Sequence, residues 1–349
     1  MRQVLAVLGG GEAFGRLGFD CLTLRHGLFS PVRVGVNLHR STPFTFGRTW
    51  TDEALRTAMK EPQNKPDPTE KIGFMNIDKT DFSTFTLGQQ IQHFEVEGYV
   101  VLPDLLDADL MHQIKAEMAD APMQTKDYSD AQTYCLEPQW RSEAVAKLIA
   151  LPPMIEFLEV LLGPQIVFTR GLFTRTLAGS PPISLHTDGQ PFGSSIFGYE
   201  GSSPRLLRVL YYLDDLTPDR APFRLVPRSH LSFHAEANPY VRYEHHPGEI
   251  TLCPKAGTAL VIPINVFHGT HPNRDREQRT LVQLGYRPAW AGPIKPMEEW
   301  DEAVVAAAPP QTKRFLQSPN TTGLEWEQPH KPKGMKTDAP AVDPRRWER

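Results

Sequence analysis

Residues 257–288, GTALVIPINVFHGTHPNRDREQRTLVQLGYRP, decide the fold class. The segment contains two β-rich runs, at 258–262 and 280–286, which are separated by a polar bend rich in histidine. Similar short runs, bounded by Pro, Gly or Asp, precede it at 166–176, 206–213, 223–226 and 249–252. Many short strands divided by turn residues are typical of an antiparallel barrel or jelly roll.

The chain before these strands has helical periodicity. Amphipathic runs are predicted as helices at 87–97, ended by Gly98, and at 108–118, capped by Asp107. Two further helices are predicted at 143–150 and 154–162, separated by Pro152-Pro153. The fold class is therefore predicted as mainly β with flanking helices.

The predicted β domain covers residues 81–308. Residues 1–80 are predicted to be an N-terminal extension, because 60–72 is polar and broken by proline. The last segment, 309–349, contains seven prolines and is predicted to be an extended tail anchored by aromatic residues such as Phe315.

Composition excludes several classes of protein. The 349 residues carry a net charge of −4, so binding to nucleic acid through phosphate neutralisation is not expected. Three widely spaced cysteines, at 21, 135 and 253, argue against a disulfide framework or a structural zinc site. No apolar run approaches the roughly 20 residues of a spanning helix, so no membrane partner is expected. We expect a cytoplasmic protein, with organellar targeting by the arginine-rich residues 1–50 as the weaker alternative.

One histidine and one carboxylate stand two positions apart in SLHTDGQ, at His186 and Asp188. On an extended strand, residues i and i+2 point to the same face. A second histidine, His268, precedes Arg279 by 11 residues. Two histidines and one carboxylate form the facial triad that suits non-haem Fe(II). A buried arginine beside such a centre is costly without an anion, and its fork geometry suits the distal carboxylate of a dicarboxylic acid.

From about residue 87 to 291 the chain resembles the phytanoyl-CoA dioxygenase family of Fe(II)/2-oxoglutarate oxygenases. The resemblance is carried by FEVEGYVVLPDLLDADL at 94–110, HTDG at 186–189, VLYYLDDLTPDRAPFRLVPRSH at 209–230 and the segment 257–288. It departs from the family at Ala221, where the family is glycine-rich, and at Arg228, where the family has the glycine of Pro-Gly-Ser-His. The change at Arg228 concerns the local turn and the substrate entrance, not the iron ligands.

The resemblance implies a double-stranded β-helix, the cupin-like jelly roll. It implies Fe(II) on the catalytic set His186, Asp188 and His268, with 2-oxoglutarate and O2 as cosubstrates. Arg279 is expected to hold the far carboxylate of 2-oxoglutarate, and the Thr270 hydroxyl to touch the same group. The implied reaction hydroxylates an unactivated C–H bond of a small organic molecule or acyl derivative and releases succinate and CO2.

Several alternatives stay open. His271 competes with His268 as the distal ligand, although the spacing to Arg279 favours His268. The chain could be a non-catalytic jelly-roll binding protein with a vestigial metal site, or a zinc hydrolase or isomerase, which would not need Arg279. Six arginines could line a groove for an anionic substrate, although ordinary ion pairs at strand ends are favoured: Arg170, Arg175, Arg205, Arg208, Arg224 and Arg228.

Overall fold

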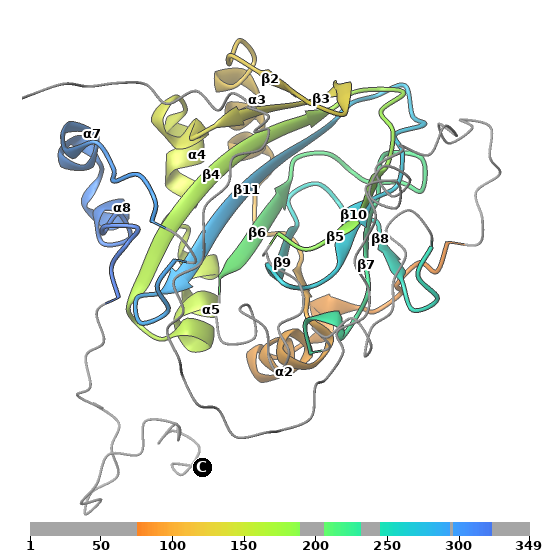
Figure 1. Cartoon of the computed structure of the whole chain (residues 1–349), viewed down its shortest axis with the longest axis horizontal. Helices are drawn as coiled ribbons and strands as arrows, with labels where there is room; N and C mark the ends of the chain where they lie inside the picture. Colours follow the sequence, from red (N-terminus) through yellow and green to blue (C-terminus); the bar gives the residue numbers. More distant parts are fainter. Residues whose placement is uncertain (1–74, 189–205, 232–244, 294–295, 323–349) are drawn as a thin grey trace, which may run out of the picture. The chain divides into compact units, whose positions relative to one another are not determined.

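The structure is a computed structural model that describes residues 75–188, 206–231, 245–293 and 296–322 (Figure 1). The possible targeting segment 1–50, Cys21, Arg205 and the tail beyond residue 322 lie outside these residues. None of the helices in the described part is long and apolar enough to cross a membrane.

Two antiparallel sheets form the core of the fold. The larger sheet has seven strands, in the order β1 (Val100–Leu102), β9 (Ala259–Pro263), β6 (Leu207–Tyr212), β11 (Arg279–Pro288), β4 (Ile166–Thr176), β3 (Ser129–Leu136) and β2 (Gln124–Lys126). The smaller sheet has four, in the order β5 (Ile183–His186), β10 (His268–Thr270), β7 (Phe223–Leu225) and β8 (Ile250–Leu252). This arrangement confirms the predicted mainly β, jelly-roll class.

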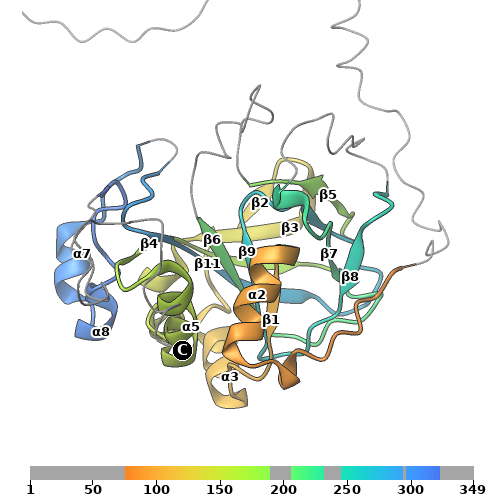
Figure 2. The same ribbon diagram turned by 90° about the horizontal axis from the view of Figure 1, so that it is seen from below.

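Helices cover the outer face of the large sheet. They are α2 (Leu87–Glu97), α3 (Ala108–Glu117), α4 (Glu143–Leu148) and α5 (Pro152–Leu162), and Figure 2 shows α2, α3 and α5 on one side of the strands. Thr86 and Gln89 form a capping box on α2, and Asp107 caps α3, as the sequence predicts. The two helices predicted at 143–150 and 154–162 are α4 and α5, but Pro152 and Pro153 form the first turn of α5 and do not precede it, since a missing N–H costs nothing there.

Side chains alternate between the two faces of the large sheet. Val282 and Leu284 of β11, with Val209 and Tyr211 of β6, are fully buried in the hydrophobic core on the outer face. Their neighbours on the same strands line a cavity on the inner face, as described below. Because the pleat separates apolar and polar positions in this way, one sheet carries both the core and the candidate site.

The C-terminal described residues pack onto the same domain. Two short helices, α7 (Glu302–Ala307) and α8 (Pro310–Lys313), lead to Phe315, which is 2% exposed and accepts a backbone hydrogen bond from Phe168 of β4. Arg287 of β11 is buried and donates to the carbonyls of Pro319 and Thr321. Phe315 is therefore buried near the start of the segment predicted to be a tail. The domain limits at 80/81 and 308/309 stay predictions.

Candidate metal centre and cosubstrate pocket

Three candidate metal ligands converge at one edge of the small sheet. His186 ends β5 and His268 begins β10, and they face each other as a cross-strand pair with ring centroids 4.5 Å apart. Asp188 follows β5, where its backbone N–H donates to the Ile264 carbonyl at 2.9 Å. The ligand atoms of the three side chains all lie within 4.8 Å of one another.

Hydrogen bonds fix which imidazole nitrogen of each histidine is free. The Nδ1 atoms of His186 and His268 lie 2.8 Å and 3.0 Å from the backbone carbonyls of Ser184 and Val266. Only a protonated nitrogen donates to a carbonyl, so each Nε2 keeps its lone pair. Both Nε2 atoms face Asp188 Oδ1, at 3.7 Å and 3.9 Å. Burial lowers the pKa of His268 to about 4, so its ring is neutral and able to bind a metal at neutral pH.

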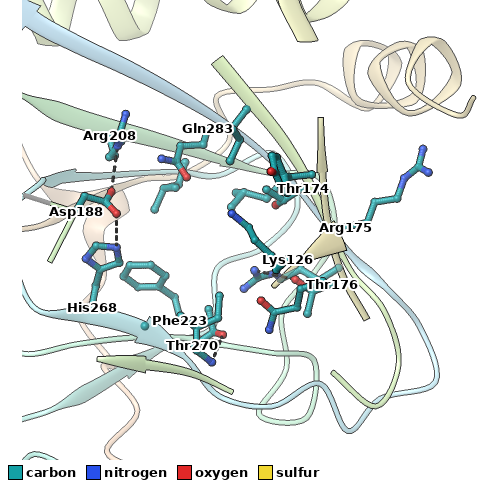
Figure 3. A pocket seen from close by; sticks show the side chains of 18 of the residues that line it. Lys126, Thr174, Arg175, Thr176, Asp188, Arg208, Phe223, His268, Thr270 and Gln283 are labelled. Carbon is teal, nitrogen blue, oxygen red and sulfur yellow. Dashed lines mark hydrogen bonds and ion pairs between the residues drawn. The ribbon is translucent and has the colours of Figure 1, made fainter. Parts of the chain in front are cut away.

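The second oxygen of Asp188 is held by an arginine. Arg208 Nε donates to Asp188 Oδ2 at 3.1 Å, which leaves Oδ1 directed at the two histidines (Figure 3). Burial raises the pKa of Asp188, but the neighbouring His186, His268 and Arg208 outweigh this effect and hold it well below its usual range. Two neutral imidazoles and one ionised carboxylate are thus presented together, and this donor set fits Fe(II).

The ligand set opens into a cavity of about 330 Å³ on the inner face of the large sheet, which we call the site cavity. In Figure 3, Asp188 and His268 lie at one end of this view, and Thr174 and Thr176 lie across the cavity from them. Phe223 of β7 stacks on the His268 ring, with centroids 5.7 Å apart and planes at 15°. An aromatic face against the ligand limits the access of water on that side.

Arg279 lies in the same cavity as a buried cation that needs an anion. It is 3% exposed, and it donates through Nη1 to the Ala221 carbonyl at 2.8 Å and through Nη2 to Thr176 Oγ1 at 3.1 Å. Its Nε has no partner, and no ion pair joins it to a carboxylate among the described residues. Burial lowers the pKa of Arg279, but a guanidinium keeps its charge at any ordinary pH.

Thr270 shares the cavity with Arg279. Its hydroxyl accepts the Ile183 N–H at 3.3 Å, and the residue is 4% exposed. A hydroxyl that accepts a backbone proton still has its own proton to donate, so Thr270 can also reach an anion held by Arg279.

His271 lies apart from the ligand set. Its Nε2 is 2.9 Å from Thr251 Oγ1, and its ring stacks on His245 with centroids 6.2 Å apart. The geometry therefore brings together His186, Asp188 and His268, and it leaves out His271, which the sequence offered as an alternative to His268. The role of the three residues as ligands is taken up below as a proposal.

The two positions where the sequence departs from glycine both have left-handed backbone. Ala221 has φ 40° and Arg228 has φ 66°, conformations that disfavour any residue with a Cβ. Arg228 compensates with a forked ion pair to Glu97, with contacts of 2.6–3.1 Å. The strained Ala221 carries the carbonyl that Arg279 binds, so this turn helps to position the cavity cation.

Sequence reasoning missed the partner of Asp188. Arg208 was one of the six arginines whose role the sequence left open. Alternation along β6 could have indicated its position, because residues 208 and 210 point into the cavity and residues 207 and 209 point into the core. The β2–β3 hairpin, which brings Lys126 and Tyr134 to the cavity, was also missed because its sequence is polar.

Comparison with known proteins agrees with this geometry. The family model for phytanoyl-CoA dioxygenase (PhyH) matches residues 94–281, which is 188 of the 349 residues. The crystal structure of SnoN, a non-heme alpha ketoglutarate dependent epimerase from nogalamycin biosynthesis, has a TM-score of 0.50 at 20% identity, over 60% of this chain and 84% of its own. SnoK, a carbocyclase from the same biosynthesis, has a TM-score of 0.50 at 15% identity, over 61% and 88%.

At these identities the two structures show a shared fold. No sequence among curated proteins matches the chain. The family match covers more than half of the chain, and the histidine–aspartate–histidine set is compatible with iron. The chain belongs to the phytanoyl-CoA dioxygenase family of Fe(II)/2-oxoglutarate-dependent enzymes.

Proposed function

We propose that this protein is an Fe(II)- and 2-oxoglutarate-dependent dioxygenase that hydroxylates an unactivated C–H bond of a small organic molecule or acyl derivative, with release of succinate and CO2. One observation carries the proposal. A donor set suited to Fe(II), His186, Asp188 and His268, lies in the same cavity as Arg279, a buried cation with no carboxylate partner among the described residues.

Each residue has a stated task. His186 and His268 would bind the metal through Nε2, and Asp188 through Oδ1, while Arg208 fixes the orientation of the carboxylate. Arg279, with the Thr270 hydroxyl beside it, would hold the far carboxylate of 2-oxoglutarate by charge-assisted hydrogen bonds. When bound, Fe(II) supplies the oxidative chemistry that couples decarboxylation of 2-oxoglutarate to oxidation of the substrate.

The fold alone leaves the reaction outcome open, since SnoN is an epimerase and SnoK a carbocyclase. We favour hydroxylation over halogenation because Asp188 would serve as a third protein ligand at the position that a halide would need. Asp188 is the only carboxylate among the described residues that line the cavity.

The test is a screen of a metabolite library for compounds that stimulate succinate formation in the presence of Fe(II), 2-oxoglutarate and O2. We expect one or more compounds to raise succinate release and to gain one oxygen atom, labelled when 18O2 is used. A product of unchanged composition would assign epimerisation, and a product that has lost two hydrogens would assign cyclisation or desaturation. A protein that neither binds Fe(II) with 2-oxoglutarate nor forms succinate would be the non-catalytic binding protein.

A further inference from the structure

The charges that line the site cavity do not balance. Its lining contains five lysine or arginine side chains and one carboxylate, Asp188; the cations are Lys126, Arg170, Arg175, Arg208 and Arg279. Binding of Fe(II) and 2-oxoglutarate would not remove this excess, because their charges of +2 and −2 cancel. A further anion is therefore needed, or each cation must find a partner elsewhere in the protein.

Most of the arginines that the sequence left without a role have such partners. Arg175 turns its guanidinium away from the cavity and donates to the carbonyls of Met118 and Ala119 (Figure 3). Arg208 is paired with Asp188. Arg224 and Arg228, outside the lining, form ion pairs with Glu249 and Glu97.

Arg170 is the exception among those of these arginines that the structure describes. It lies on β4 and lines the cavity, and its guanidinium makes no hydrogen bond or ion pair with any described residue. Lys126 of β2 lines the same cavity, and its Nζ lies 4.2 Å from the centre of the Tyr134 ring, without a carboxylate within ion-pair distance in the described part of the chain. The pKa of Arg170 is lowered mainly by burial and secondly by repulsion from Arg208. The pKa of Lys126 is lowered mainly by burial and secondly by repulsion from Arg170.

The sheet register places Arg170 at the opposite end of the cavity from Arg279. Arg279 pairs with Thr176, six residues from Arg170 on the same strand, which is about 20 Å at 3.3 Å per residue. The guanidinium of Arg279 is fixed at its own end by Thr176 and Ala221. The backbone positions of the two arginines therefore lie at opposite ends of the cavity, and only the guanidinium of Arg279 is held by protein acceptors in the described part of the chain.

The glycine between Arg170 and Arg208 leaves room for neighbouring side chains. In the cross-strand row Arg170–Gly285–Arg208, a Cβ on Gly285 would lie 2.6 Å from Thr169 Oγ1 and 2.9 Å from Arg208 Nη1. The next row presents Leu172 and Leu210 on either side of Gln283. Two leucines thus lie next to the Arg170 row, on the side that leads toward Arg279.

Resting on the proposed function, we infer that the substrate is a small molecule with an oxyanion, a carboxylate or a phosphate, which Arg170 binds at the end of the cavity where Arg208 holds Asp188. Arg170 has the fork geometry that binds such a group through two parallel hydrogen bonds, whereas the register of the β2–β3 hairpin places Lys126 nearer to the Arg279 end. Because Arg170 shares a cross-strand row with Arg208, the partner of Asp188, an anion held by Arg170 keeps the substrate beside the metal ligands.

The test uses full-length protein loaded anaerobically with Fe(II) and 2-oxoglutarate. The probes are matched pairs: aliphatic carboxylic acids with their carboxamides, and alkyl phosphates with their alcohols. Calorimetry should show that at least one acid or phosphate binds more tightly than its neutral partner. For that probe, Arg170→Gln should weaken binding about 10- to 100-fold, because a charge-assisted contact is lost. A difference in affinity between acid and carboxamide would assign a carboxylate, and a difference between alkyl phosphate and alcohol would assign a phosphate.

The affinity for 2-oxoglutarate should stay within a factor of about two in Arg170→Gln, since that site is held by Arg279. Arg314→Gln, which removes an exposed arginine paired with Glu159, is the matched control and should change neither affinity. The inference is wrong if no anionic probe binds better than its neutral partner, or if Arg170→Gln binds the preferred anion as wild type does. Failure of the proposed function is seen separately, as absence of 2-oxoglutarate binding or of succinate formation.

Discussion

Replacement of Arg279 by leucine tests the cosubstrate site most sharply. The side chain is 3% exposed and supplies the buried positive charge opposite the proposed far carboxylate. Removal of one partner from a buried ion pair costs about 3–5 kcal/mol, because the remaining charge stays desolvated. At about 1.4 kcal/mol per tenfold, the dissociation constant of 2-oxoglutarate should rise by at least about 100-fold. Loss of the donors to Ala221 and Thr176 should also lower the free energy of unfolding by about 1–3 kcal/mol.

The assay is anaerobic titration of the Fe(II)-loaded protein with 2-oxoglutarate and with 2-oxopentanoate, which has the same chain length but no far carboxylate. Wild type should prefer 2-oxoglutarate by about 100-fold or more, and Arg279→Leu should bind both acids equally weakly. Fe(II) content should not change, and Arg279→Lys should recover part of the preference. Equal binding of 2-oxoglutarate by wild type and Arg279→Leu would refute the assignment and place the anchor elsewhere.

Three further outcomes are expected. Arg208→Leu frees Asp188 Oδ2, so Fe(II) affinity should fall about 10- to 100-fold in metal titrations, and unchanged affinity would contradict the positioning role. Asp188→Ala removes the anionic ligand, so both Fe(II) affinity and succinate formation should collapse, and hydroxylation at the normal rate would show that the carboxylate is not a ligand. Burial lowers the pKa of His271 to about 4 from 6.5, so the unfolded chain binds the extra proton between these values. Stability in urea should therefore fall by about 3 kcal/mol through this group as pH drops from about 6.5 to about 4, and His271→Asn should show a flatter profile; parallel profiles would contradict it.

Much of the fold could be predicted from local patterns. Some elements depend on residues that are adjacent in the sequence: the capped helices α2 and α3 and the apolar strands β4, β6, β9 and β11. The bounds of these elements were predicted to within a few residues. The β2–β3 hairpin was missed because its strands are polar on the cavity side, and a polar strand has no periodic apolar signal. The short strand β10 was missed because its three residues, His-Gly-Thr, have no apolar alternation that would predict a strand.

The site was partly predictable because ligand spacing is a local feature, whereas orientation is not. The pair at 186 and 188 and the order of His268 and Arg279 can be read along the chain. The link between Arg208 and Asp188, and the separation of His271 from the cluster, depend on which strands become neighbours. The sequence also could not tell which arginines would be paired, since the partners of Arg175 and Arg228 lie 57 and 131 residues away.

The central claim is that Fe(II) and 2-oxoglutarate bind together on His186, Asp188 and His268. The most direct measurement is the visible absorption of the anaerobic protein, in which a 2-oxo acid chelated to Fe(II) gives a weak metal-to-ligand charge-transfer band. The band should form in wild type and in His271→Ala, and be lost in His186→Ala and His268→Ala. A band that survives in His268→Ala but disappears in His271→Ala would contradict the account.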